Sequence, residues 1–243
     1  MTYCVAIKVN AGMVFLADTR TNAGMDNISK YKKMFTWEVP GDRVITMMTA
    51  GNLSITQAVI SLLQENIDKP QDGIDTILNA DSMFRVAEIV GDAMRVIQNR
   101  YGTNIAQMGE STMSSIILGG QRVGGITRLF HIYSAGNFIE AGEVTPYFQI
   151  GEHKYGKPIL DRVISMDTPV DVCVTAAMLS MDSTLRSNLS VGMPLDLSVI
   201  NTNELLFAQN RRIEDHDPNY IALSESWSSA LRNAFDEMVK FKV

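Results

Sequence analysis

The chain has 243 residues, of which 46% are hydrophobic and 20% charged, and these proportions are typical of a globular protein with a substantial core. Its formal net charge of −6 argues against a general nucleic-acid-binding protein, whose surface would be basic. The sequence shows neither a signal peptide nor a run approaching the roughly 20 apolar residues of a membrane helix. We therefore expect a cytoplasmic protein with a single domain spanning residues 1–243.

The residues that commonly hold metals or cofactors are scattered. Cys4 and Cys173 are too few for a disulfide framework, and we expect two reduced, buried thiols. The three histidines form no HExxH pattern and no Ser-His-Asp arrangement. The glycine-rich stretch at 119–125 lacks the Lys-Ser/Thr of a phosphate-binding loop and is interpreted as a hairpin turn. The sequence thus predicts no metal and no cofactor.

Four strands are expected at the start of the chain. Apolar alternation over 3–9 and 13–18 surrounds Asn10-Ala11-Gly12, which we expect to supply the positive φ values of a tight hairpin. A polar segment follows, and then a second strand pair at 33–39 and 43–50 is turned by Pro40-Gly41.

The hydrophobic period then changes to that of helices. Apolar residues spaced by about 3.6 predict helices over 52–67, with Asn52 as N-cap, and over 81–99. The remaining expected elements are strands at 112–119, 126–134 and 146–150, helices at 155–165 and 168–186, strands at 195–200 and 204–210, and a terminal amphipathic helix at 219–242.

This order, in which helix pairs interrupt sets of strands, predicts two stacked sheets with helices on both outer faces. Runs such as SSIILG and DVCVTAAML indicate burial on more than one side. The expected fold is therefore α+β, a four-layer αββα sandwich.

The second residue, Thr2, is the first candidate for chemistry. If Met1 is removed, Thr2 carries a hydroxyl and an α-amine on adjacent carbons. The amine, with an ordinary pKa of about 7.7–8.0, can act as the base that activates the hydroxyl as a nucleophile.

Other polar residues are expected at the same end of the sheet as Thr2. The second strand ends in LADTR, which brings Asp18 and Arg20 there because the first two strands form a hairpin. Lys33 begins a later strand and can lower the effective pKa of the hydroxyl while Asp18 holds its ammonium. Gly51, between a strand and a helix, can present its N–H as an oxyanion hole.

Together Thr2, LADTR, Lys33 and Ala50-Gly51 resemble the proteasome-type N-terminal nucleophile hydrolases, and most closely their bacterial Anbu branch, which begins MTYC in this manner. The resemblance covers roughly residues 1–205. It implies a catalytic set of Thr2, Asp18, Arg20, Lys33, Gly51 and Ser190, with Lys33 one residue closer to Thr2 than the family pattern. It also implies that Asn137 and Ser187 replace family residues that support the terminal amine.

The resemblance implies a threonine-type peptidase that acts on peptides or unfolded proteins. It also implies assembly into a homo-oligomeric ring or open spiral, served by an unfoldase partner. We expect helices 52–67 and 81–99 to form the subunit contacts, with Leu62, Leu63, Met94 and Ile97 serving core and interface together. Two alternatives stay open: a small-molecule amidase or acylase that uses the same Thr2, and a non-catalytic ring subunit.

Overall fold

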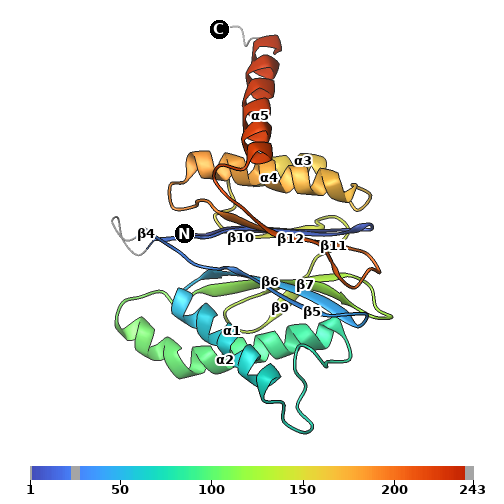
Figure 1. Cartoon of the computed structure of the whole chain (residues 1–243). Helices are drawn as coiled ribbons and strands as arrows, with labels where there is room; N and C mark the ends of the chain where they lie inside the picture. Colours follow the sequence, from blue (N-terminus) through green and yellow to red (C-terminus); the bar gives the residue numbers. More distant parts are fainter. Residues whose placement is uncertain (1, 23–27, 239–243) are drawn as a thin grey trace.

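The computed structural model describes residues 2–22 and 28–238. Two five-stranded antiparallel sheets face one another, and helices cover both outer faces (Figure 1). The predicted four-layer αββα sandwich is confirmed.

The first sheet contains the N-terminal hairpin. Its strand order is β10-β1-β2-β11-β12. Helices α3 (Lys157–Val163) and α4 (Val170–Ser187) lie on its outer face (Figure 1). The strands are β1 (Tyr3–Val9), β2 (Gly12–Asp18), β10 (Tyr147–Gly151), β11 (Leu195–Asn201) and β12 (Phe207–Ile213).

The second sheet has the order β5-β6-β7-β8-β9, and helices α1 (Leu53–Asp68) and α2 (Met83–Gln107) cover its outer face (Figure 1). Asn52 caps α1, as predicted, because its side-chain oxygen accepts the N–H of Ile55. The strands are β5 (Met34–Val39), β6 (Arg43–Gly51), β7 (Ser114–Arg122), β8 (Arg128–Ile132) and β9 (Phe138–Glu140).

The alternation along β1 divides its side chains between two cores. Tyr3, Val5 and Ile7 pack under α3 and α4, whereas Cys4 and Ala6 pack between the sheets. Burying each large apolar side chain stabilises the fold by roughly 1.5–3 kcal/mol. These contacts tie the chain into the core from its third residue onward.

Several element boundaries differ from those expected. Helix α2 extends to Gln107, and the last strand pair is shifted, since β12 covers Phe207–Ile213 rather than 204–210. The polar segment after Asp18 contains two short paired strands, β3 (Arg20–Asn22) and β4 (Ile28–Lys30). Strand β9 has three residues, too few to show an alternating pattern, and was not expected either.

The first hairpin turn does not use the expected geometry. Val9 pairs with Gly12, so the turn consists of Asn10 and Ala11, and neither these residues nor Gly12 has a positive φ. Gly12 is required for a different reason: a Cβ there would lie 2.3 Å from the carbonyl oxygen of Ile200 on β11. Close strand packing, and not turn geometry, therefore selects this glycine.

The terminal helix α5 (Pro218–Glu237) projects away from the sandwich and contacts α4 only near its base (Figure 1). Asp217 caps it by accepting the N–H groups of Asn219 and Tyr220. The interface role expected for Leu63, Met94 and Ile97 is wrong, because all three are at most 2% exposed in the core beneath α1 and α2. Leu62 is only partly buried against this core, and its interface role stays a prediction.

Candidate active site

The main chain at Thr2 and Tyr3 is held by a backbone hydrogen bond to Glu152 and by the buried Tyr3 side chain. The Thr2 carbonyl accepts the N–H of Glu152 at 2.7 Å. The Tyr3 side chain is fully buried, and its hydroxyl hydrogen-bonds with Ser180 Oγ and accepts from Gln149 Nε2, both at 2.6 Å. Thr2 is thus anchored directly before β1.

Asp18 and Lys33 form a buried ion pair beside this strand end. Lys33 Nζ lies 2.6 Å from Asp18 Oδ1 and also donates to the carbonyl of Arg20 at 2.5 Å. The two side chains are 4% and 0% exposed. Lys33 therefore presents an ammonium group whose position is fixed.

The Asp18 carboxylate has further donors. Its Oδ1 accepts the N–H of Tyr3 at 3.0 Å, and its Oδ2 accepts that of Gly192 at 3.2 Å. Burial raises the pKa of Asp18 above the ordinary carboxyl value, while Lys33 and the two N–H groups act in the opposite direction. Three hydrogen-bond donors converging on one carboxylate favour its ionised form near neutral pH.

Thr2 and Lys33 line one pocket of about 580 Å³. Gly51, at the end of β6, also lines it and has a φ of +98°. A Cβ at Gly51 would lie 2.2 Å from the carbonyl oxygen of Met113, so both backbone conformation and space demand glycine. The remaining lining residues are Thr21, Thr49, Ala50, Leu53, Thr56, Glu110 and Gly151.

Arg20 and Ser190 lie behind the pocket rather than on its wall. Arg20 Nη1 donates to the carbonyl of Leu189 at 2.9 Å, and its side chain packs against Gly192. The backbone N–H of Ser190 donates to Asn188 Oδ1. Arg20, at the start of β3, thus contacts the segment that follows α4, and Ser190 lies within that segment.

The structure does not bring Asn137 or Ser187 to the pocket. Asn137 is exposed in the turn between β8 and β9, and Ser187 is exposed at the end of α4. Neither residue is among those that line the pocket.

Two other polar residues lie beside the start of β1 instead. Glu152 follows β10, is 9% exposed, and accepts Asn188 Nδ2 at 3.2 Å. Its own N–H binds the Thr2 carbonyl, as described above. No local sequence pattern points to this pair, because its position depends on β10 pairing with β1.

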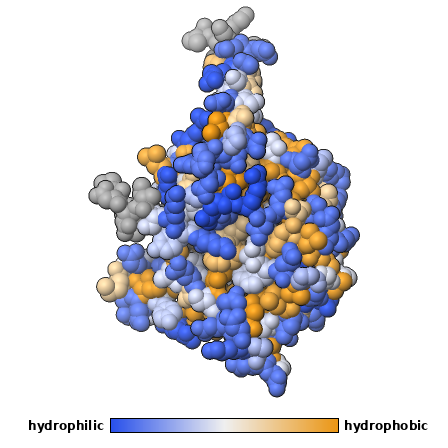
Figure 2. All heavy atoms as spheres, viewed as in Figure 1, coloured by the Kyte–Doolittle hydropathy of each residue, from blue (hydrophilic) through white to orange (hydrophobic). Residues whose placement is uncertain are grey.

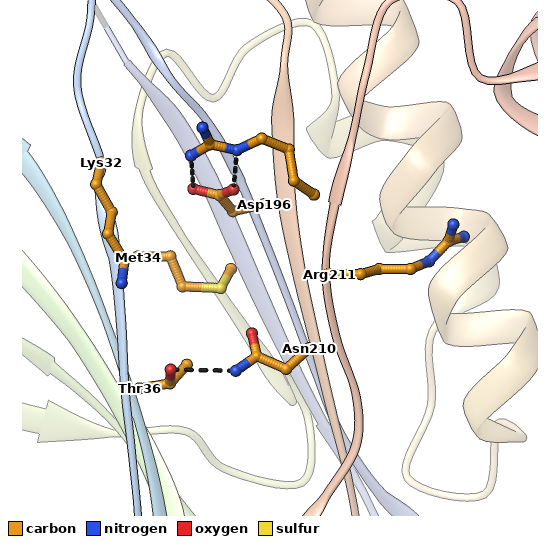
Figure 3. Close-up of a pocket in the computed structure, with 7 residues that line it drawn as sticks. Lys32, Met34, Thr36, Asp196, Asn210 and Arg211 are labelled. Carbon is orange, nitrogen blue, oxygen red and sulfur yellow. Dashed lines mark hydrogen bonds and ion pairs between the residues drawn. The ribbon is translucent and has the colours of Figure 1, made fainter.

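A second, smaller pocket of about 270 Å³ lies between the edge strands β5 and β12 (Figure 3). Its lining includes Lys32, Thr36 and the ion pair of Asp196 with Arg212. Lys32 is exposed, with its Nζ 5.5 Å from the centroid of the Phe35 ring.

The described residues offer neither a metal site nor a membrane-spanning helix. Within 2–22 and 28–238, no group of three or more His, Cys, Asp or Glu side chains is arranged to hold a metal ion. None of the helices in this same part of the chain is both long and apolar enough to span a membrane.

Comparisons with known proteins agree with this geometry. Residues 2–200 match the proteasome family model, described as a proteasome subunit. A search of curated proteins found no match.

Solved structures of Anbu proteins match over nearly the whole chain. An Anbu Gly-1 mutant from Hyphomicrobium sp. strain MC1 is 47% identical, with a TM-score of 0.93 and 100% of both chains covered. Anbu, described as an ancestral beta-subunit, from Yersinia bercovieri is 43% identical, with a TM-score of 0.92 and coverage of 99% of this chain and 100% of that one. A helical assembly of the Anbu complex from Pseudomonas aeruginosa is 41% identical, with a TM-score of 0.93 and coverage of 99% and 98%. The chain belongs to the proteasome family, and within it is similar throughout its length to the Anbu proteins.

Proposed function

We propose that this protein is a threonine peptidase whose nucleophile is Thr2 after removal of Met1. The observation that carries the proposal is the buried, Asp18-bound ammonium of Lys33 in the pocket that Thr2 lines. A fixed positive charge at this point stabilises the oxygen that loses its proton during attack.

The proposed reaction uses the Thr2 amine as its base. Thr2 Oγ attacks the substrate carbonyl carbon, and its proton passes to the amine. The N–H of Gly51 stabilises the tetrahedral oxyanion. Collapse breaks the C–N bond, the amine returns the proton to the leaving group, and water then hydrolyses the Thr2 ester.

Peptidyl epoxyketones test this proposal, because their two electrophilic carbons react with the hydroxyl and the amine of an N-terminal threonine. Intact mass before treatment reports Met1 removal, and the mass after treatment reports labelling. We expect one label per chain, abolished in Thr2→Ala. Thr36→Ala, which alters the pocket between β5 and β12, is the matched control and should label normally. Active protein that retains Met1 would refute the mechanism.

We also propose that the protein assembles into a homo-oligomeric open spiral or ring that encloses the pockets. The Pseudomonas aeruginosa relative is described as a helical assembly. In this chain α5 stands clear of the body as a column (Figure 2) and exposes Ile221, Leu231 and Phe235. Apolar side chains on a projecting helix favour contact with another subunit.

Native mass spectrometry tests the assembly. We expect a species of many subunits, and a shift to smaller species when Leu231 and Phe235 are both replaced by Glu. Both side chains are at least 51% exposed, so the variant should retain the fold of the sandwich. A stable, active monomer at micromolar concentration would contradict the proposal.

A further inference from the structure

The pocket that contains Thr2 has one uncompensated charge among its described lining residues. Two of those residues are charged, Lys33 and Glu110. Lys33 is neutralised by Asp18 at 2.6 Å. Glu110 is exposed, and within the described part of the chain its carboxylate makes no hydrogen bond or ion pair. Apart from the amine of processed Thr2, which must be neutral to act as the base, Glu110 therefore carries the one charge of this lining that no partner among the described residues neutralises.

Hydrogen bonds to the start of α1 fix the segment that carries Glu110. This segment links α2 to β7 and follows Gln107. The N–H of Asn52 donates to the carbonyl of Met113, and Asn52 Nδ2 donates to that of Ser111, both at 2.9 Å. Because Asn52 directly follows Gly51, the segment is tied to the residue proposed to bind the oxyanion.

The other side chains of the pocket are uncharged. Leu53 contributes an apolar surface, and Thr21, Thr49 and Thr56 contribute hydroxyl groups. A lysine or arginine side chain combines an apolar stem with a cationic end, and such side chains place the stem on apolar surface while the charge stays at a polar edge. An apolar wall with a carboxylate at its rim matches that pattern.

We infer that Glu110 makes the pocket selective for substrates with lysine or arginine at the residue whose carbonyl is attacked. This inference rests on the proposed function, because it assumes that the pocket binds the acyl side of the scissile bond. An acidic side chain at that substrate position would be repelled by Glu110, and a neutral one would lack the ionic attraction.

Three epoxyketones that differ only in this side chain, Arg, Leu or Glu, test the inference. We expect wild-type protein to react fastest with the Arg probe and slowest with the Glu probe. In Glu110→Gln the ratio of the Arg rate to the Leu rate should fall by about fivefold, the magnitude of a largely exposed ion pair. Raising the salt concentration should lower the same ratio in wild type, because salt screens an exposed pair.

Glu143→Gln is the matched control. Glu143 is also exposed but lies in the segment before β10, whose other end contributes Gly151 to the pocket. The control should keep the wild-type ratio.

An Arg-to-Leu ratio that is the same in wild type and Glu110→Gln would overturn the inference. It would assign Glu110 the structural role of a carboxylate near the positive N-terminal end of α1. Failure of the proposed function gives a different result, namely no labelling of wild-type protein by any of the three probes.

Discussion

Two lysines that are adjacent in sequence, Lys32 and Lys33, lie in two different pockets. Lys33 lies in the pocket with Thr2, where its side chain is 4% exposed and its ammonium is bound to Asp18. Lys32 lies in the pocket between β5 and β12, where it is exposed to solvent (Figure 3). Each pocket also has its own ion pair with an aspartate.

The two ion pairs differ in burial. The Lys33–Asp18 pair is almost completely buried, whereas Arg212 and Asp196 are 45% and 13% exposed. In water, a charge pair is screened and its geometry varies, so it contributes little to stability or to chemistry. A buried charge acts at a fixed position and in a low dielectric. Residue types alone therefore do not distinguish a candidate catalytic lysine from its neighbour, but burial does.

The largest expected effect is on reactivity. Lys33→Ala should slow epoxyketone labelling of Thr2 roughly 100-fold or more, because it removes a preorganised charge beside the nucleophile. Lys32→Ala should change the rate less than about twofold, in keeping with an exposed charge. Wild-type rates in Lys33→Ala would contradict the proposed role of the buried ammonium.

Next in size is the effect on stability. Asp18→Asn should lower the free energy of unfolding by about 1–3 kcal/mol, because the amide NH2 group would face one of the donors that the carboxylate accepts and leave that buried donor unpaired. Asp196→Asn should cost about 1 kcal/mol or less, since Arg212 remains solvated. Urea denaturation of the two variants measures the difference directly.

A double variant provides the control for this comparison. Asp18→Asn combined with Lys33→Met removes both charges, and should recover much of the stability while remaining unreactive. Equal destabilisation by Asp18→Asn and Asp196→Asn would show that burial does not separate the two pairs.

The sequence was sufficient to predict the layers and the central group of the site. Alternation along β1 and β2 indicated a hairpin, and a hairpin places Asp18 near Thr2 whatever the rest of the chain does. Lys33 and Gly51 followed from the resemblance together with their places at strand ends. These predictions depend on short-range geometry or on a recognisable motif.

Contacts that depend on which strands lie side by side could not be predicted from these local sequence patterns. Glu152 reaches Thr2 because β10 pairs with β1, and Gly192 reaches Asp18 from the segment before β11. Gly12 is required because β11 packs against its Cα. Each contact joins residues more than a hundred positions apart, and alternation within one strand does not say which strand will lie beside it.

The smallest expected effect is a change of slope in the pH dependence of labelling. The Thr2 amine must be neutral to act as the base, so below its ordinary pKa of about 7.7–8.0 the rate should fall tenfold per pH unit. Asp18 must be ionised to hold Lys33, and burial raises the pKa of this carboxyl above 3.8. Below the raised pKa a second proton blocks the reaction, so the slope should steepen from one to two at a pH above 3.8.

Because the folded state binds this proton more tightly than the unfolded chain does, the contribution of Asp18 to stability falls as pH rises through that interval and is not lost on acidification. The steepening should therefore occur while circular dichroism still reports a folded protein. Asp196→Asn should keep both slopes, and a slope of one down to the ordinary carboxyl range would show that Asp18 does not control the reactivity of Thr2.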